Sequence, residues 1–253
     1  MSKRIENVQI VILAAGKGKR MGGDEPKALA MLRDKPFLRH ILDTLETLDI
    51  SIKPVIVVGH KKECVQEIIG SHHTYAVQHE QLGTGHAVSS AKTVLHSDYQ
   101  TLLVLSTDQP LVSKETIENL IKVHNETKAT ITLATVVLPD FAEWRAGLKN
   151  FGRIVRGRDG SVESIVEFKD ANDEEKEIKE VNPALYAFDA DWLWRNIDKI
   201  KNENAQGEYY LTSLIHMAFE QGEKVQAVPV TNILEGLQPN TKEELEVLEK
   251  LVI

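Results

Sequence analysis

Residues 8–21 have the sequence Val8-Gln9-Ile10-Val11-Ile12-Leu13-Ala14-Ala15-Gly16-Lys17-Gly18-Lys19-Arg20-Met21. The first six are almost all apolar, the pattern of a β-strand buried on both faces of a sheet. Small and basic residues follow at once. Small residues let backbone N–H groups approach an anion closely, and the cations neutralise its charge. The stretch therefore predicts a strand and a loop that binds polyphosphate; the plainer alternative is a surface loop with incidental charges.

This loop belongs to neither of the two best-known phosphate-binding motifs. A Walker loop ends in Gly-Lys-Ser/Thr, which does not occur here, and Met21 takes the place of the third glycine of the dinucleotide fingerprint. Residues 1–40 nevertheless hold nine Lys and Arg against four Asp and Glu, in a chain whose net charge is −8. A basic segment in an acidic protein suggests a small anionic ligand, although a solvated basic face has the same composition.

Strand-like and helix-like segments alternate through the first half of the chain. Apolar runs at 54–58 and 102–105 resemble the run at 8–13, and segments with a helical period lie between and after them. The predicted buried helix faces are Leu38, Ile41, Leu42, Leu45 and Leu48; Ala87, Val88, Ala91, Val94 and Leu95; and Ile117, Leu120, Ile121 and His124, the last helix with Ser113 as its N-cap. This alternation predicts an α/β fold: a Rossmann-like, mostly parallel sheet with helices on both faces.

The second half has a different pattern. Residues 151–169 predict two strands around the hairpin turn Arg158-Asp159-Gly160, and residues 181–188 predict another strand. A helix with Leu211, Leu214, Ile215, Ala218 and Phe219 on one face is expected, and a last helix from Thr241 to Leu251. We expect one domain over 1–253, with a nucleotide-binding lobe at about 1–138 and a smaller β lobe, the substrate half, at about 139–253.

The composition excludes several classes of protein. A chain of 253 residues can bury a large core, and 42% of it is hydrophobic. Cys64 is the single cysteine, which excludes an internal disulfide and is typical of a reducing compartment. No apolar run approaches the roughly 20 residues that span a bilayer, and no signal-peptide core is present. We therefore expect a cytoplasmic protein, and its acidic charge argues against nucleic-acid or membrane partners.

Several segments carry a family resemblance. LAAGKGKRM at 13–21, followed by PKAL, resembles the signature of nucleotidyltransferases that join a nucleoside triphosphate to a sugar-1-phosphate. Further segments, among which QLGTGHA and NAQGEYYLT are much more specific than LAAGKGKRM, are similar in order and spacing to the N-acetylglucosamine-1-phosphate uridylyltransferases, the N-terminal domain of bifunctional bacterial enzymes. These are QHEQLGTGHA at 78–87, STDQPL at 106–111, FGRIVR at 151–156, IVEFKDA at 165–171, EVN at 180–182 and NAQGEYYLT at 204–212. The resemblance covers essentially the whole chain.

Three charged residues are the candidate catalytic groups. Asp108 follows a predicted buried strand, where a carboxylate can hold Mg²⁺ against phosphate oxygens; an Asp that caps a turn is the alternative. Arg20 and Lys27 are candidates to stabilise charge on the triphosphate as pyrophosphate leaves, unless they are solvated loop cations. Neither a Ser/His nor a Cys/His arrangement is evident, in keeping with a reaction that needs no protein nucleophile.

The binding residues are expected in two groups. The Gln78 amide and the backbone of Gly83 and Thr84 can recognise the edge of a base. The resemblance implies that the nucleotide also contacts Leu13, Ala14, Ala15, Gly16, Gly18, Ser106 and Thr107. It implies that Gly152, Glu167 and Asn182 bind the sugar, and Lys169, predicted on the same strand face as Glu167, can meet the sugar phosphate.

The sequence departs from the family pattern at three points. Thr107-Asp108 replaces Gly-Asp, and Asn182-Pro183-Ala184 replaces Asn-Thr-Gly, which adds a methyl group near the expected sugar. The second metal ligand, an Asn in the family, aligns with Gln238, while Asn240 lies two residues further on, and either amide can supply the oxygen. The hexapeptide-repeat acetyltransferase domain is not found in the sequence, so acetyl transfer is not expected.

The resemblance implies a Mg²⁺-dependent nucleotidyltransferase that joins UTP and N-acetylglucosamine-1-phosphate, two small-molecule substrates, to give UDP-N-acetylglucosamine and pyrophosphate. One alternative is the same chemistry with another nucleotide and acceptor, such as CTP and a cofactor-type acceptor, because Asp108-Gln109-Pro110 resembles the molybdenum-cofactor nucleotidyltransferases at that point. The other is a non-catalytic regulatory protein that binds a nucleotide sugar, for which Pro183, Ala184 and Gln238 would be signs of a degenerate site. The sequence does not determine the oligomeric state.

Overall fold

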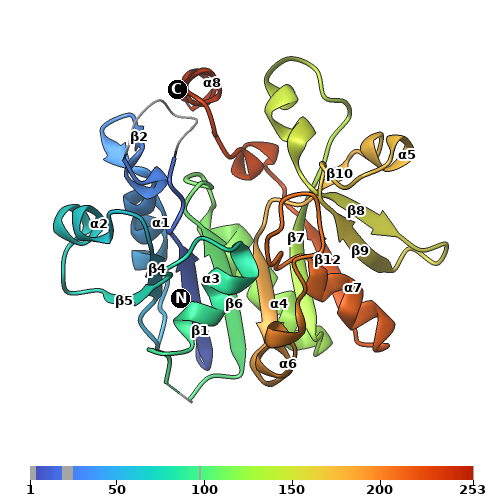
Figure 1. Ribbon diagram of the computed structural model, residues 1–253, viewed down its shortest axis with the longest axis horizontal. Coiled ribbons are helices and arrows are strands. Elements are labelled where there is room, and N and C mark those ends of the chain that lie inside the picture. The colour runs from blue at the N-terminus through green and yellow to red at the C-terminus, as the bar shows by residue number, and fades with distance from the viewer. Residues whose placement is uncertain (1–3, 19–24, 97, 253) are drawn as a thin grey trace.

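The computed structural model describes residues 4–18, 25–96 and 98–252, and its centre is a sheet of ten strands (Figure 1). The strands of this sheet are β1 (Val8–Leu13), β4 (Val55–Val58), β5 (Thr74–Val77), β6 (Thr101–Ser106), β7 (Ile131–Val137), β8 (Arg153–Arg156), β9 (Val162–Val166), β10 (Glu180–Val181), β11 (Tyr186–Asp189) and β12 (Val225–Pro229). Their spatial order is β5-β4-β1-β6-β11-β7-β10-β8-β9, and β12 pairs with β7. β2 (Met31–Leu32) and β3 (Lys35–Pro36) form a separate two-stranded sheet.

The helices connect these strands. The α-helices are α1 (Phe37–Glu46), α2 (Lys62–Ile69), α3 (Thr84–Ala91), α4 (Lys114–Thr127), α5 (Asp173–Lys176), α6 (Ala190–Asn196), α7 (Ser213–Glu220) and α8 (Lys242–Leu251). Short 3₁₀ helices are η2 (Lys27–Leu29), η3 (Glu143–Asn150), η4 (Ile197–Lys199) and η5 (Ile233–Gly236). None of the helices in the described part of the chain is both long enough and apolar enough to cross a membrane.

The predicted fold class is confirmed. β1 pairs in parallel with both β4 and β6, and β4 pairs in parallel with β5. β11 is antiparallel to both of its neighbours, and β8 is antiparallel to both β10 and β9. The strands of the second half therefore extend the same sheet, with β11 lying between β6 and β7 of the first half.

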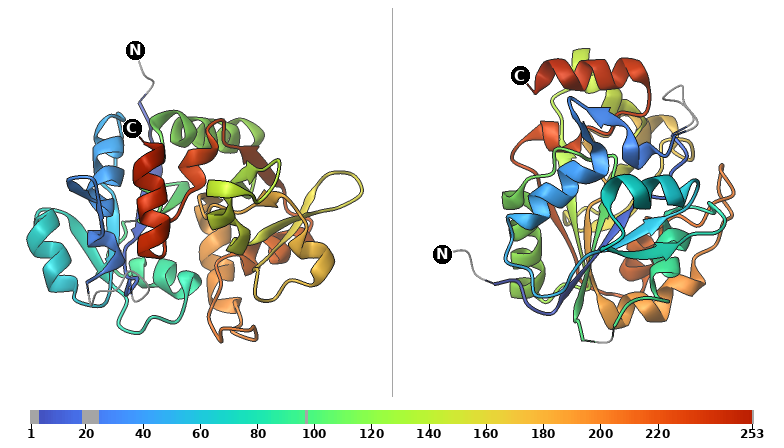
Figure 2. Two further views of the ribbon diagram at one scale, coloured as in Figure 1. Left: turned by 90° about the horizontal axis from the view of Figure 1, so that it is seen from above. Right: turned by 90° about the vertical axis from the view of Figure 1, so that its left-hand side faces the viewer.

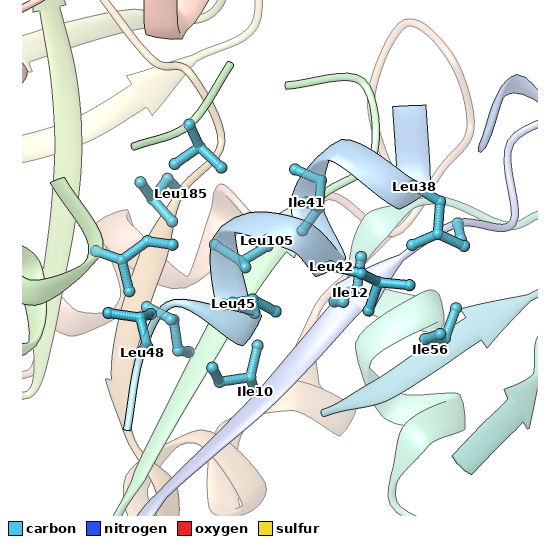
Figure 3. Close-up of a cluster of buried hydrophobic side chains, with 14 of the residues drawn as sticks. Ile10, Ile12, Leu38, Ile41, Leu42, Leu45, Leu48, Ile56, Leu105 and Leu185 are labelled. Carbon is cyan, nitrogen blue, oxygen red and sulfur yellow. The ribbon is translucent and has the colours of Figure 1, made fainter. Parts of the chain in front are cut away.

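Hydrophobic cores lie on both faces of the sheet because successive strand residues point to opposite sides. Ile10 and Ile12 belong to one core, together with α1, α2 and α4, whereas Val11 belongs to the other, together with α3, α6 and α7. Figure 3 shows Leu38, Ile41, Leu42 and Leu45 of α1 covering the strands of the first core. Burying one such side chain contributes about 1.5–3 kcal/mol, so these two cores dominate the stability.

A third core joins distant parts of the chain below α8. It contains Leu32 and Phe37 near β2, Leu148 and Phe151 near β8, and Leu248 of α8. In Figures 1 and 2 α8 accordingly lies over the region between the N-terminal elements and the β8–β9 hairpin. Thr241 caps this helix by accepting a hydrogen bond from the Glu244 backbone N–H. The helix therefore begins at Lys242, two residues after Asn240.

The structure corrects two predictions about the second half. The strand predicted at 181–188 is two strands, β10 and β11, because the chain turns at 182–185. Pro183 has no N–H to donate, Ala184 is left-handed with φ of 62°, and the Asn182 side chain accepts a hydrogen bond from the Ala184 N–H. The helix at 211–219 is α7, but Phe219 is 40% exposed and does not lie on its buried face.

Candidate active site

The site begins where β1 and β6 end side by side. Leu13 pairs with Ser106 at the carboxyl ends of these parallel strands, where ligands bind in open α/β sheets. The Thr107 backbone N–H and its hydroxyl both donate to the Leu13 carbonyl, at 3.1 and 3.0 Å. The Thr107 side chain, which replaces the family's glycine, is thus turned into the protein and is only 4% exposed. The structure therefore brings the loops that begin at Ala14 and Ser106 together.

Lys27 joins three segments at this edge. Its backbone N–H donates to the Gly16 carbonyl, which places it against the phosphate-binding loop predicted at residues 13–21. Its ammonium donates to Asp108 Oδ2 at 2.9 Å and to Asn240 Oδ1 at 2.7 Å. Lys27 and Asp108 both have largely buried side chains, so solvent screens their ion pair weakly. Arg20, the other predicted cation, lies outside the described residues.

One carboxylate oxygen of Asp108 has no hydrogen-bond partner among the described residues. Burial by itself would raise the pKa of Asp108, but the Lys27 charge and hydrogen bonds to the carboxylate lower it below its usual value. The group is therefore ionised at neutral pH. Its Oδ1 atom is buried and has no hydrogen-bond partner among the residues that the structure describes. A buried charged oxygen of this kind is costly unless a ligand satisfies it.

These residues fit a hard divalent cation. Mg²⁺ prefers carboxylate and amide oxygens and commonly uses only one or two protein ligands beside phosphate oxygens. Asp108 Oδ1 and the Asn240 amide oxygen, both grouped around Lys27, are donors of this kind. Within 4–18, 25–96 and 98–252, no cluster of three or more His, Cys, Asp or Glu side chains is arranged for a metal. A cation at Asp108 would therefore need oxygens from its substrates.

The two candidates for the second ligand are separated by the structure. The Gln238 side-chain amide donates to the Pro183 carbonyl, in the turn between β10 and β11. Asn240 instead reaches Lys27, while its own side-chain amide donates to the Gln238 carbonyl at 2.8 Å. The residue that aligns with the family's ligand thus supports a turn, and the residue two positions later lies beside Lys27 and Asp108.

The predicted base-recognition loop is fastened to the second half of the chain. Tyr209 N–H donates to the Leu82 carbonyl, Gly85 N–H donates to the Tyr209 carbonyl, and Thr84 Oγ1 accepts from Leu211 N–H, all within 2.8–3.0 Å. Gly83 has φ of 109°, and a Cβ there would lie 2.7 Å from the Tyr209 carbonyl oxygen. The segments QLGTGHA and NAQGEYYLT are therefore in direct contact.

Gln78 lies behind this loop. Its amide donates to the Gly83 carbonyl at 3.0 Å and lies 3.1 Å from His86 Nδ1, and the residue is only 3% exposed. The structure therefore shows Gln78 holding the loop in shape. Its part in recognising a base stays a prediction.

The predicted sugar-binding residues form one row across three strands. Arg153 pairs with both Val166 and Val181, so in these antiparallel strands the preceding residue, Gly152, lies opposite Glu167 and Asn182. Asn182 N–H donates to the Gly152 carbonyl at 2.9 Å. A Cβ on Gly152 would lie 2.9 Å from Ile165 Cγ2 and 3.5 Å from both Glu167 carboxylate oxygens. A side chain at this position would clash with Ile165 and would lie in contact with the Glu167 carboxylate.

Two residues that the sequence analysis did not single out complete this row. Thr212 donates its hydroxyl to Glu167 Oε1 at 3.0 Å, and the Asn182 amide donates to the Tyr186 hydroxyl at 2.7 Å. Burial raises the pKa of Glu167 despite the Thr212 hydrogen bond, and burial also raises the pKa of Tyr186. Thr212 is the last residue of the NAQGEYYLT segment, and its place in that segment is the one sequence signal that could have pointed to it as a site residue.

Lys169 is placed differently from the prediction. β9 ends at Val166, and Lys169 lies in a turn after it, so it does not share a strand face with Glu167. Its ammonium donates to Gln206 Oε1 at 2.6 Å, and Asp170 accepts from the Ala205 N–H at 2.8 Å. This turn and the NAQGEYYLT segment therefore contact each other beside the predicted sugar-binding row.

Comparison with known proteins gives consistent similarities. The family described as "MobA-like NTP transferase domain" matches residues 10–145. The chain is 43% identical over 232 residues to the bifunctional protein GlmU of Exiguobacterium sibiricum. The matched region covers 92% of this chain and 50% of that protein. It is 42% identical over 240 residues to GlmU of Bacillus velezensis, with 94% and 51% covered. The chain thus spans about half the length of these curated relatives.

A solved structure has the same fold. The crystal structure of a UDP-glucose pyrophosphorylase in complex with UDP-glucose matches with a TM-score of 0.74, covering 100% of this chain and 98% of that one. The two sequences are 14% identical, so the likeness concerns the fold.

Proposed function

The chain belongs to the MobA-like NTP transferase domain family, whose match covers more than half of its length, and from this premise we propose its reaction. In this proposal the protein is a Mg²⁺-dependent nucleotidyltransferase that joins UTP and N-acetylglucosamine-1-phosphate, giving UDP-N-acetylglucosamine and pyrophosphate. The observation that carries this proposal is Asp108, which is held by Lys27 beside Asn240. It is an ionised carboxylate with a buried oxygen that no described residue hydrogen-bonds. The choice of substrates rests on the similarity to GlmU over more than nine-tenths of this chain and on the segments at 78–87 and 204–212.

The reaction requires positioning and charge stabilisation. A phosphate oxygen of the acceptor attacks the α-phosphorus of UTP, a new P–O bond forms, and the bond to the pyrophosphate oxygen breaks. No protein nucleophile takes part. A divalent cation held by Asp108 and Asn240 would neutralise charge on the phosphate oxygens. The Lys27 ammonium, which lies against the loop after β1, would turn to the triphosphate and stabilise the departing pyrophosphate.

The acceptor would lie against the row Gly152, Glu167 and Asn182. The Glu167 carboxylate accepts hydrogen bonds from hydroxyl groups, as it does from Thr212, and the absence of a side chain at Gly152 leaves room beside it. Direct contact between the 80–85 and 207–211 segments would fix the nucleotide and the acceptor relative to each other. Fixing two reactants in line accounts for much of the rate enhancement in such enzymes.

Pyrophosphate release tests the proposal. The purified protein is incubated with and without Mg²⁺, with UTP, CTP, GTP, ATP or dTTP crossed against a panel of sugar-1-phosphates. Mg²⁺-dependent release with UTP and N-acetylglucosamine-1-phosphate is the expected result, and Asp108→Ala should abolish it. Release with a different pair, including CTP, would retain the reaction type and discard the substrates. Tight binding of a nucleotide sugar without release in any combination would favour a regulatory protein.

A further inference from the structure

Arg153 is the largest fully buried side chain of the described residues, with 0% of its surface exposed. A buried guanidinium is normally paired with a carboxylate. Within the described part of the chain, however, no ion pair involves Arg153. The charge is instead satisfied by backbone carbonyls and aromatic rings. The positions of these partners in the chain show which segments Arg153 holds together.

The partners of the Arg153 guanidinium come from three different segments. It donates to the Lys149 carbonyl at the end of η3 (2.7 Å), to the Phe151 carbonyl, and to the Lys176 carbonyl at the end of α5 (3.2 Å). Its Cζ atom also lies over two aromatic rings, 4.9 Å from the centre of Phe141 and 5.1 Å from that of Phe168. Planar guanidinium groups suit this combination of forked donation and stacking, which an ammonium group cannot reproduce.

Each of these segments adjoins one residue of the predicted sugar-binding row. Lys149 and Phe151 precede Gly152, Phe168 follows Glu167, and Lys176 ends the helix that leads to β10 and Asn182. Arg153 itself pairs with Val166 and Val181, one register step from the row. Because neighbouring strand residues point to opposite faces, the guanidinium holds the three segments from behind the row.

We propose that Arg153 is a positioning residue for the acceptor: it fixes the backbone on which Gly152, Glu167 and Asn182 are placed, without touching substrate. This inference rests on the proposed function, since it assigns the row to the acceptor. The inference predicts that a change at Arg153 affects the two substrates unequally. The hydrogen bonds and ring contacts of the Arg153 guanidinium all lie within residues 141–176, and none involves the nucleotide loops at 13–18, 78–85 and 106–108. We therefore expect loss of the guanidinium to affect binding of the acceptor far more than binding of UTP.

The test compares Arg153→Lys with Arg156→Lys. Arg156 lies on the same strand, but it is exposed and pairs with the Glu180 carboxylate at 2.7 Å, which makes it a matched control. We expect Arg153→Lys to raise the KM for N-acetylglucosamine-1-phosphate by about 10–100-fold and to leave the KM for UTP within about twofold, as for the loss of a supporting contact. Arg156→Lys should change neither. Phe168→Leu, which keeps the arginine and removes one ring, should shift the acceptor KM in the same direction.

A role in stability alone gives a different result. In that case Arg153→Lys lowers the melting temperature while both KM values of the folded protein stay unchanged, which would overturn the inference. If Arg153→Lys does not fold, an unchanged acceptor KM in Phe168→Leu would overturn it.

Amide hydrogen exchange distinguishes failure of the inference from failure of the proposed function. If the wild type is inactive with every substrate pair, the proposed function fails. The positioning role is then decided by exchange at 167–171 and 182–185. Faster exchange in Arg153→Lys than in Arg156→Lys would support it, and equal exchange would overturn it.

Discussion

Asn240 and Gln238 lie two residues apart and have different tasks. The Asn240 amide oxygen lies 2.7 Å from Lys27 Nζ beside Asp108, whereas the Gln238 amide holds the Pro183 carbonyl. We therefore expect Asn240→Ala to raise the Mg²⁺ concentration needed for half-maximal activity by about 10–100-fold, as is typical when groups around a metal are removed. Gln238→Ala should change it by less than about threefold. Pyrophosphate release titrated with Mg²⁺ measures both variants.

The reverse ranking would be equally informative. If Gln238→Ala had the large effect and Asn240→Ala the small one, the family's alignment would have given the ligand correctly. The 237–241 segment would then have to rearrange when substrates bind.

The Glu167 carboxylate is expected to favour acceptor binding and, at high pH, to lower the stability of the folded protein. Burial raises its pKa, so in the folded protein it holds a proton more firmly than in the unfolded chain. The contribution of the Glu167 carboxyl group to the free energy of unfolding is therefore fully present below the ordinary pKa of glutamate. It is lost as pH rises through the raised folded-state pKa. Glu167→Gln removes this loss. We expect the variant to melt at a higher temperature than the wild type at about pH 8, with the difference vanishing toward about pH 4.

The same variant should lose acceptor affinity, because an amide accepts hydrogen bonds less strongly than a carboxylate. Glu163→Gln, on the same strand β9, is the control for both measurements. A Glu167→Gln protein that is no more stable than the wild type at high pH would mean that the buried carboxylate is better satisfied than its burial and the Thr212 contact indicate.

At the scale of elements, the turn between β10 and β11 contains a strained residue. Ala184 has φ of 62°, a region that costs an L-residue about 1–2 kcal/mol and glycine almost nothing. Glycine also loses more entropy on folding, so we expect Ala184→Gly to raise the free energy of unfolding by at most about 1 kcal/mol. Urea denaturation measures this value.

Lys128→Gly is the matched control for this turn. Lys128, the C-cap of α4, has φ of 52° and is exposed, so its replacement by glycine should bring a similar gain in stability. Ala184→Gly alone should also change the acceptor KM, since the Asn182 side chain accepts from the Ala184 N–H. Equal kinetics in both variants would place the Ala184 methyl group away from the acceptor.

Elements with strong local signals could be predicted from the sequence. β1 has the predicted bounds, because six consecutive residues suited to a buried strand are followed by small residues. α4 begins after Ser113, whose hydroxyl accepts from the Thr116 N–H at 3.1 Å. In both places the signal and the structure it determines lie within a few residues of each other.

Features that depend on contacts between distant segments could not be predicted. Arg153 and Arg156 both flank the apolar pair Ile154-Val155, yet one is fully buried and the other pairs with Glu180 near the surface. What separates them is the position of η3 and α5. The Asn240 side chain likewise lies beside Lys27 because Gln238 is held by Pro183, from a different part of the chain. Spacing along the sequence contains neither fact.

At the scale of the whole molecule, the two halves of the chain share one sheet. β11, from the second half, lies between β6 and β7 of the first, with hydrogen-bonded register on both sides. The third core and the contact between the 80–85 and 207–211 segments join the halves again. A lobe that shares its central strands with its neighbour cannot unfold alone without exposing both cores. We therefore expect one cooperative unfolding transition.

One intrinsic probe and one attached probe report on the two halves separately. All three tryptophans, Trp144, Trp192 and Trp194, lie in the second half, whereas Cys64, the single cysteine, is exposed on α2 in the first half and can carry a fluorescent label. The urea midpoints from tryptophan fluorescence and from the label should coincide, and both should match circular dichroism of the unlabelled protein. Separate midpoints would mean that the lobes at about 1–138 and 139–253 fold independently. The continuous sheet would then contribute less to cohesion than the packing within each lobe.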